Sequence, residues 1–345
     1  MIRFLSDNTA GASAEITDAI LAVNRGREPP YGDDPWSKRL DQVFGEFFDT
    51  EVRVFTVATG TAANALALAT VTPPYGAIFA HEEAHVIRDE GGAPEFFCGG
   101  ARLITIPGRH GKVTAENLTR ALESNPPTVH TVQPAALTLT QASEFGTVYR
   151  LAEIATLAEI AHARRLAVHM DGARFANAVV TLDCHPGATT WRAGVDVLSF
   201  GATKNGALGA EAVVFFDLKR ASDFELRRKS AGHLLSKSRY VAAQLLAYIE
   251  SGLWRRNAER TNELAQRIGA AAAERLLGPV EANEVFIELD EEEKRKLRHA
   301  GFEFSDWGAE RSSATRFVVS WDQPEEDVRA LCAALSRPGA RLSRR

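Results

Sequence analysis

Cysteine is scarce in this chain, and the few that occur are not arranged in pairs. Its three cysteines, Cys98, Cys184 and Cys332, lie far apart, and their number is odd. Neither a disulfide framework nor a zinc site has such spacing, so we expect no structural metal and no secreted, disulfide-rich fold. The scarcity favours the reducing environment of the cytoplasm.

Long apolar runs and an excess of one charge are also missing. No segment is apolar over the length of a membrane span, and the opening residues "MIRFLSDNTAG" have no signal-peptide core, so we expect neither membrane insertion nor secretion. The net charge is −5, from 40 basic and 45 acidic residues. This balance gives no electrostatic reason to expect a nucleic acid or an anionic membrane as a partner.

The chain has the composition of a globular protein and the length for two domains. Its 345 residues are 45% apolar and 25% charged. Between about residues 51 and 217, short apolar runs alternate with helical patterns; the runs are "VRVFTVA", "GAIFAHE", "ARLITIP", "TVHTVQ", "LAVHM", "VDVLSF" and "EAVVFFD". This alternation predicts an α/β fold with a mostly parallel sheet and helices on both faces.

The pattern changes in the last third of the chain. Long helical patterns are followed by "EVFIELD", "TRFVVSWD" and "PEEDVRALCAALSR", which predict a small α+β unit. We therefore expect an N-terminal segment over residues 1–30, a large α/β domain over 31–250 and a small C-terminal domain over 251–345.

A strand-to-helix turn in "VATGTAANALALA" could hold a phosphate. Thr59 and Thr61 offer hydroxyl groups, Gly60 lets the backbone approach closely, and the N–H groups that open the helix point toward an anion. An ordinary helix N-cap would explain the same residues. The turn alone leaves both interpretations open.

Two further polar groups follow predicted strands. Asp171 and Arg174 come directly after "LAVHM", and Lys204 lies among small residues after "DVLSF". Ligands of parallel sheets bind at the carboxyl ends of strands, so these side chains are candidates for a site. A helix-capping aspartate and a solvated lysine would be the structural explanations. A phosphate cup, a carboxylate for a pyridinium nitrogen and an amine for a Schiff base are together what pyridoxal 5'-phosphate requires.

Several motifs in order resemble one family over nearly the whole chain. They are "FLSDNTAG", "PPYGDDPWSKRLDQVFGEFF", "VFTVATGTAANALALA", "HEEAHVIRDEGGAPEFF", "VHMDGARFANA" and "SFGATKNG". The chain resembles the threonine aldolases, or β-eliminating lyase group, which are fold type I pyridoxal-phosphate enzymes. Within the group, "LTLTQASEFGTVY" is most similar to the low-specificity L-threonine aldolase and phenylserine aldolase branch.

The resemblance implies a role for each matching residue. Lys204 would form the Schiff base, Asp171 would pair with the ring nitrogen, and His85 would stack on the ring; these are the implied catalytic groups. Thr59, Gly60 and Thr61 would hold the phosphate. Arg174 would lie near the phenolic oxygen or the substrate carboxylate, and the implied substrate-binding residues also include Ser6, Tyr31 and Arg316. The family also implies a homodimer or homotetramer.

The implied reaction is the reversible cleavage of L-threonine, L-allo-threonine or phenylserine to glycine and an aldehyde. One departure affects it, because some relatives carry a histidine near the substrate hydroxyl where this chain reads "TQASEFG", with Ser143 or Glu144 in that neighbourhood. The acceptor of the hydroxyl proton is therefore left open among His85, Glu90 and a water between them.

Other functions remain as alternatives. The same cofactor could serve a β-eliminating lyase or an aminotransferase, and a chain with a decayed site could bind the cofactor without catalysis. A nicotinamide-dependent enzyme is disfavoured, because no Gly-x-Gly-x-x-Gly turn follows the first strand.

Overall fold

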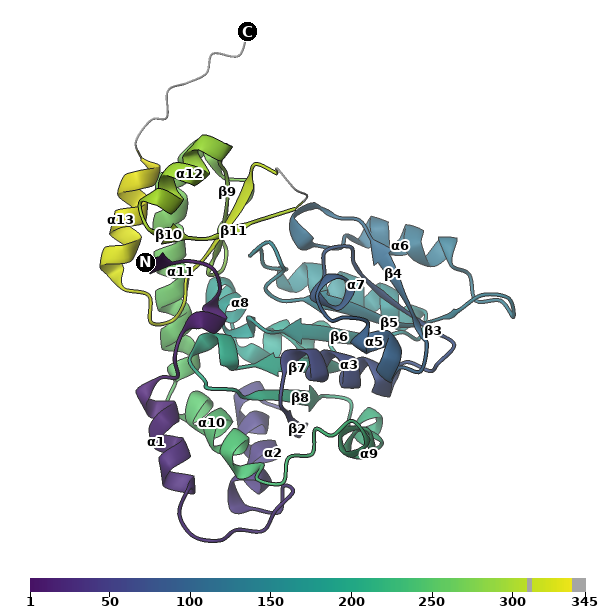
Figure 1. The fold of residues 1–345 in the computed structure, drawn as a ribbon. Helices are drawn as coiled ribbons and strands as arrows, with labels where there is room; N and C mark the ends of the chain where they lie inside the picture. The colour runs from purple at the N-terminus through teal and green to yellow at the C-terminus, as the bar shows by residue number, and fades with distance from the viewer. Residues whose placement is uncertain (309–311, 337–345) are drawn as a thin grey trace.

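A seven-stranded sheet forms the centre of the protein in the computed structural model, which describes residues 1–308 and 312–336 (Figure 1). Its strand order is β2-β8-β7-β6-β5-β3-β4. The strands are β2 (Arg53–Val57), β3 (Gly76–His81), β4 (Arg102–Ile106), β5 (Gln133–Thr140), β6 (Ala167–Gly172), β7 (Val197–Gly201) and β8 (Glu211–Phe215). β8 is antiparallel to both of its neighbours and every other pair is parallel, which confirms the mostly parallel sheet expected from the sequence.

Helices cover both faces of this sheet. They are α1 (Ala14–Val23), α2 (Pro35–Phe48), α3 (Gly60–Val71), α4 (His85–Arg88), α5 (Ala93–Phe97), α6 (Ala115–Ser124), α7 (Leu151–Ala163), α8 (Phe175–Leu182), α9 (Phe224–Ser230) and α10 (Arg239–Glu250). Side chains of α2, α6, α7, α8 and α10 pack on one face. Those of α3, α5 and α9 pack on the other. Because successive strand residues point to opposite faces, strands such as β2, β3 and β8 contribute to both cores.

The small C-terminal unit has a sheet and a core of its own. It contains α11 (Leu253–Ala272), β9 (Glu284–Glu288), α12 (Glu291–His299), β10 (Phe302–Glu303), β11 (Ser305–Asp306), β12 (Ala314–Val318) and α13 (Glu325–Leu335). The strands β11, β12 and β9 form an antiparallel sheet. The N-terminal strand β1 (Ile2–Arg3) pairs in parallel with β10, so the start of the chain lies beside this unit in Figure 1.

One expected strand is displaced along the chain. The run "TVHTVQ" was expected as a strand, but its first residues form an exposed loop and β5 begins only at Gln133. The hydroxyl of Thr131 donates to the carbonyl of Pro126 at 2.6 Å, which folds the loop back on itself, and Val129 is 93% exposed. Without a partner strand or a buried face, the β-branched residues of the loop have nothing to pack against.

We propose the domain boundaries expected above, with the N-terminal segment at 1–30, the large domain at 31–250 and the small domain at 251–345, of which 309–311 and 337–345 lie outside the described residues. Separate cores support this division, because Leu264, Ile268 and Phe317 belong to the small unit's core. Phe4 packs in that same core, so the first residues of the N-terminal segment are bound to the small domain, whereas Ile16 of α1 packs in the core of the large domain. Within the described residues, no helix is long and apolar enough to cross a bilayer.

Phe200 on β7 should be a principal stabilising residue of the large domain. It is 1% exposed, and its ring lies 5.1 Å from Phe44, 6.0 Å from Phe175 and 6.1 Å from Tyr248, measured between centroids. Phe200→Ala should lower the free energy of unfolding by about 3–5 kcal/mol, because the substitution leaves a cavity and the strands around it can relax only partly to fill it. Denaturant titration measures this loss. Phe96→Ala, at a 78% exposed ring, is the control and should cost less than about 0.5 kcal/mol.

Candidate active site

The face of the sheet that carries α3 is polar at the carboxyl ends of its central strands. In β6, Val168 and Met170 pack in the core on the opposite face, so His169 and Asp171 point toward α3. The same alternation directs Ser199 of β7 toward α3. Strand periodicity thus gathers hydrogen-bonding groups on one face, at the edge where ligands of parallel sheets bind.

A cavity of about 420 Å³ lies at this edge. It brings together six of the residues singled out in the sequence, namely Thr59, Gly60, Thr61, His85, Asp171 and Lys204. The remaining lining residues are Asn8, Ala58, Asn64, Glu144, Ala173, Thr203, Leu208, Gly209 and Glu211. The lining is rich in groups that can bind a charged ligand.

The first turn of α3 opens onto the cavity. Thr59 is the helix N-cap, and its hydroxyl oxygen accepts a hydrogen bond from the backbone N–H of Ala62 at 3.1 Å. The N–H groups of the residues that open a helix have no partner within it, so they can bind an anion. The capping role and a place in the cavity wall, which the sequence left as alternatives, are both present.

Asp171 is held in a fixed orientation. Its Oδ2 accepts a hydrogen bond from Nδ2 of Asn64 at 2.9 Å, and its Oδ1 accepts one from the backbone N–H of Ala173 at 3.0 Å. Two positions earlier on the same strand, His169 bridges the hydroxyls of Thr138 and Ser199. Burial lowers the pKa of His169 to about 4, so this imidazole is neutral near pH 7. The carboxylate of Asp171 is 4% exposed and rigidly presented.

His85 and Glu90 form a coupled pair in the cavity wall. Nδ1 of His85 lies 2.9 Å from Oε1 of Glu90, whose side chain has no exposed surface. The same Oε1 accepts a hydrogen bond from Nδ2 of Asn64 at 2.7 Å. Burial raises the pKa of Glu90, and the hydrogen bond to Glu90 raises the pKa of His85. The amide of Asn64 therefore connects this pair to Asp171.

Lys204 sits on a tightly anchored turn after β7. The turn is the 3-10 helix Thr203–Asn205, and the side chain of Asn205 donates to the hydroxyl of Tyr248 at 2.6 Å and to the carbonyl of Trp254 at 2.8 Å. The lysine is thus not on a freely solvated loop, and it faces the cavity with Glu211. Burial raises the pKa of Glu211 to about 7, although Thr203 and Lys204 oppose the rise.

Arg174 does not line the cavity but lies buried behind it. Its Nε and Nη2 donate to the two carboxylate oxygens of Asp7 at 2.8 and 3.2 Å, and its Nη1 lies 3.3 Å from Oε2 of Glu284. These anions keep the pKa of Arg174 high despite its burial. Ser6, next to Asp7, accepts a hydrogen bond from the backbone N–H of Asn8 at 3.1 Å and so opens the short helix that carries Asn8 into the cavity wall.

Arg316 and Tyr31 also lie outside the cavity lining. Nη1 of Arg316, on β12, is 3.5 Å from Oε1 of Glu284, and its guanidinium lies 4.9 Å from the ring of Trp307. Tyr31 is 47% exposed and lines a different cavity of about 300 Å³, together with Arg228. Within this chain, the structure does not bring Tyr31 to Lys204.

Sequence reasoning missed some cavity residues. Of the two candidates in "TQASEFG", Ser143 points away, with its hydroxyl donating to the carbonyl of His110 at 3.0 Å, whereas Glu144 lines the cavity. Burial raises the pKa of Glu144. The residues that were missed include Glu211 and Asn64. The acidic residue that opens the apolar strand "EAVVF" was a detectable signal for Glu211, whereas Asn64 has no distinguishing pattern within its helix.

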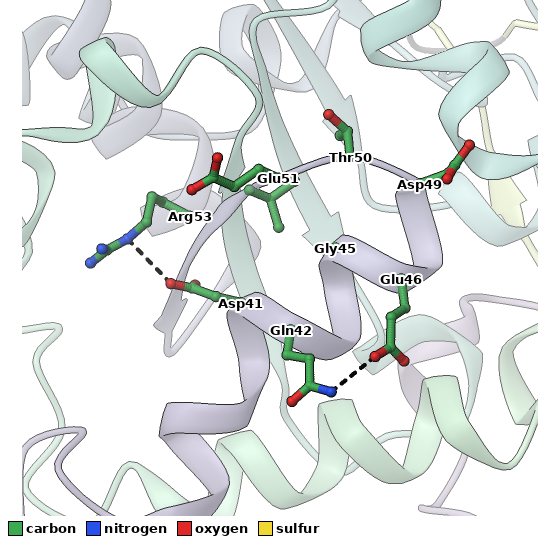
Figure 2. A pocket seen from close by; sticks show the side chains of 9 residues that line it. Asp41, Gln42, Gly45, Glu46, Asp49, Thr50, Glu51 and Arg53 are labelled. Atoms are coloured by element: carbon green, nitrogen blue, oxygen red, sulfur yellow. Dashed lines mark hydrogen bonds and ion pairs between the residues drawn. The ribbon is translucent and has the colours of Figure 1, made fainter.

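A second hollow, about 650 Å³, lies on the surface between α2 and β2 (Figure 2). Glu46, Asp49 and Glu51 are exposed there, and Asp41 is paired with Arg53 at 3.3 Å. It contains none of the candidate site residues. In the part of the chain that the structure describes, no cluster of histidine, cysteine and acidic side chains is arranged to hold a metal ion.

Comparisons with known proteins identify the class of protein first from the fold. A threonine aldolase from Leishmania major superposes with a TM-score of 0.91, covering 98% of this chain and 99% of that one at 23% identity. A putative L-allo-threonine aldolase from Listeria monocytogenes superposes with a TM-score of 0.73, covering 97% and 95% at 13% identity. The fold type I architecture implied by the sequence is confirmed.

The sequence comparisons then give the family. The family described as "Beta-eliminating lyase" matches residues 3–292. The low specificity L-threonine aldolase of a Pseudomonas strain is 41% identical over 96% of both chains, and that of Pseudomonas aeruginosa is 41% identical over 95% of both. The chain belongs to the β-eliminating lyase family, as its motifs indicated.

The contact between His85 and Glu90 predicts a measurable titration. Glu90→Gln should lower the pKa of His85, because it removes the carboxylate that stabilises the imidazolium. NMR titration of the histidine ring protons measures the change. Asp196→Asn is the matched control, since Asp196 raises the pKa of His162 in the same way and lies outside the cavity. A pKa of His85 unchanged in Glu90→Gln would show that the pair is not coupled.

Proposed function

We propose that the protein is a pyridoxal-phosphate-dependent aldolase that cleaves β-hydroxy-α-amino acids reversibly to glycine and an aldehyde. L-Threonine, L-allo-threonine and phenylserine are the substrates of choice. The observation that carries the proposal is the convergence of the α3 N-terminus, Asp171, Lys204 and His85 on one cavity, in a chain 41% identical over nearly its whole length to low specificity L-threonine aldolases.

The residues present fit this cofactor. The space above Gly60 is open, because a Cβ added there would meet only Oε2 of Glu211, at 3.8 Å, which leaves room for a phosphate against the backbone of Thr59 and Thr61. Asp171 supplies an anion for the protonated ring nitrogen, and Lys204 supplies a primary amine for covalent attachment. We assign these roles to the residues, with His85 stacking on the ring.

When bound, pyridoxal phosphate supplies an electron-accepting ring that stabilises negative charge at the substrate Cα. The protein determines which bond to Cα breaks, by holding the substrate in one orientation. Arg174, Arg316 and Ser6 are proposed to bind the α-carboxylate for this purpose. Asn64 fixes the position of Asp171 relative to the His85–Glu90 pair, because its side-chain amide donates hydrogen bonds to the carboxylates of both Asp171 and Glu90.

Removal of the β-hydroxyl proton is assigned to the His85–Glu90 pair. Its hydrogen bond at 2.9 Å lets a proton taken up by the imidazole be stabilised by the buried carboxyl of Glu90. Glu144, which lines the same cavity, is the other group that could receive this proton directly.

Cleavage of the named substrates tests the proposal. The holoenzyme should release acetaldehyde from L-threonine and L-allo-threonine and benzaldehyde from phenylserine, with glycine in equal amount; a coupled alcohol dehydrogenase assay measures the aldehydes. Lys204→Ala should abolish both the activity and the visible absorbance of covalently bound cofactor. His85→Asn should lower kcat by about 10²–10⁴-fold.

Other products would contradict this function. Ammonia and a keto acid from the amino acid alone would indicate a β-eliminating lyase, and turnover only with an added keto acid would indicate an aminotransferase. A coloured protein without any product would indicate a non-catalytic cofactor-binding protein.

We also propose that the protein works in the cytoplasm as a homodimer or homotetramer. The position of Tyr31 supports the assembly. Tyr31 is exposed and lines a different cavity of its own chain, so a tyrosine with a role at the site would have to reach the site of a neighbouring subunit. Light scattering should give two or four times the mass of 37.5 kDa. A monomeric mass together with full aldolase activity would contradict the proposed assembly.

A further inference from the structure

A buried carboxylate lies between the two arginines proposed to bind the substrate. Glu284 opens β9 and has no exposed side-chain surface. Its Oε2 is 3.3 Å from Nη1 of Arg174, and its Oε1 is 3.5 Å from Nη1 of Arg316. Neither oxygen has a hydrogen-bond partner, and Nε of Arg316 is also buried without one. This cluster therefore has unused donors and acceptors in the protein interior, which is costly.

The two arginines beside Glu284 already face carboxyl groups before any ligand binds. Asp7 occupies Nε and Nη2 of Arg174, so the Nη1 that faces Glu284 is the donor left for another anion. Glu144 adds a third carboxyl group to the surroundings of Arg174. Two guanidinium groups thus face three carboxyl groups. An additional carboxylate would bring a fourth carboxyl group to these two guanidinium groups.

Glu284 is the carboxyl group of this cluster that is most easily neutralised by taking up a proton. Burial raises its pKa to about 7, and Glu144 and Asp7 reinforce this rise, whereas Arg174 and Arg316 oppose it. The pKa of Asp7 is lowered, although burial opposes this, because Arg174, Lys204 and Asn283 stabilise its charge, so Asp7 stays ionised. Glu144 is the remaining candidate, with its pKa raised by burial.

We propose that Glu284 is a positioning residue that holds Arg174 and Arg316 in place in the free enzyme and takes up a proton when a substrate carboxylate binds to them. Protonation releases the two Nη1 donors for the ligand and removes the repulsion between the two carboxylates. The inference rests on the proposed function, because it assumes an amino-acid ligand whose carboxylate binds at these arginines.

The sign of the pH effect follows from linkage. Ligand binding favours the protonated Glu284, so its pKa is higher in the complex than in the free enzyme. Below pH 7 Glu284 already carries the proton in the free enzyme, so ligand binding needs no proton from solvent. Above pH 7 it must be taken from solvent, so the affinity attributable to this group falls about tenfold for each pH unit.

Proton uptake during glycine binding tests the role of Glu284. Titration calorimetry of the holoenzyme at pH 8, in two buffers of different ionisation enthalpy, gives the number of protons taken up with glycine. Wild-type protein should take up close to one proton more than Glu284→Gln, and the variant should bind glycine about tenfold more tightly than wild type at this pH. Glu288→Gln, at the exposed end of the same strand, is the matched control and should behave like wild type.

Equal numbers of protons taken up by wild type and Glu284→Gln would overturn the proposal. Any proton taken up would then belong to another group, and Glu144 would be the first to test. A second measurement needs no variant. Glycinamide has an amide in place of the carboxylate, so wild-type holoenzyme should take up about one proton fewer with glycinamide, after correction for the amine ionisation of each free ligand. The aldehyde assay is independent of both results, so failure of this inference and failure of the aldolase function are distinguishable.

Discussion

A guanidinium group buried at the meeting point of three chain segments is the constraint on which the rest of the structure depends. Arg174 follows β6 in the large domain, Asp7 lies in the N-terminal segment and Glu284 lies in the small unit. Ion pairs of this kind add little net stability, but losing one partner leaves an uncompensated buried charge that costs about 3–5 kcal/mol. The arrangement of the three segments is therefore the one in which Arg174 keeps both of its carboxylate partners. This arrangement also places Asn8, next to Asp7, in the cavity wall.

At the carboxyl ends of its central strands, the sheet separates stability from chemistry by its two faces. Leu198 and Phe200 on β7 point into the large apolar core, and Ser199 between them points toward α3 and the polar network. This division lets the strands be anchored on one side while their other side carries hydrogen-bonding groups. It also explains the tight packing around Asp171, which is held by Asn64 of α3 rather than by a mobile loop.

Much of the fold and part of the site could be predicted from the sequence, because they follow local rules. Strand periodicity and the position of ligands at strand ends were enough to single out Asp171, Lys204 and the turn at Thr59. The partners of Arg174 could not be predicted in this way, because Asp7 is 167 residues away from it and no spacing rule joins them. Resemblance placed Arg174 at the substrate, but did not reveal the carboxylates that already neutralise it.

The pairing of β1 with β10 has a consequence for biosynthesis. Arg3 and Glu303 form an ion pair across 300 residues of sequence, and Phe4 donates its backbone N–H to Glu303. The residues of β1 therefore remain without their partner strand until the ribosome has synthesised β10, 300 residues later. A nascent chain can assemble its central sheet earlier, but β1 can dock only after β10 has been synthesised, so completion of the active centre is a late event of folding.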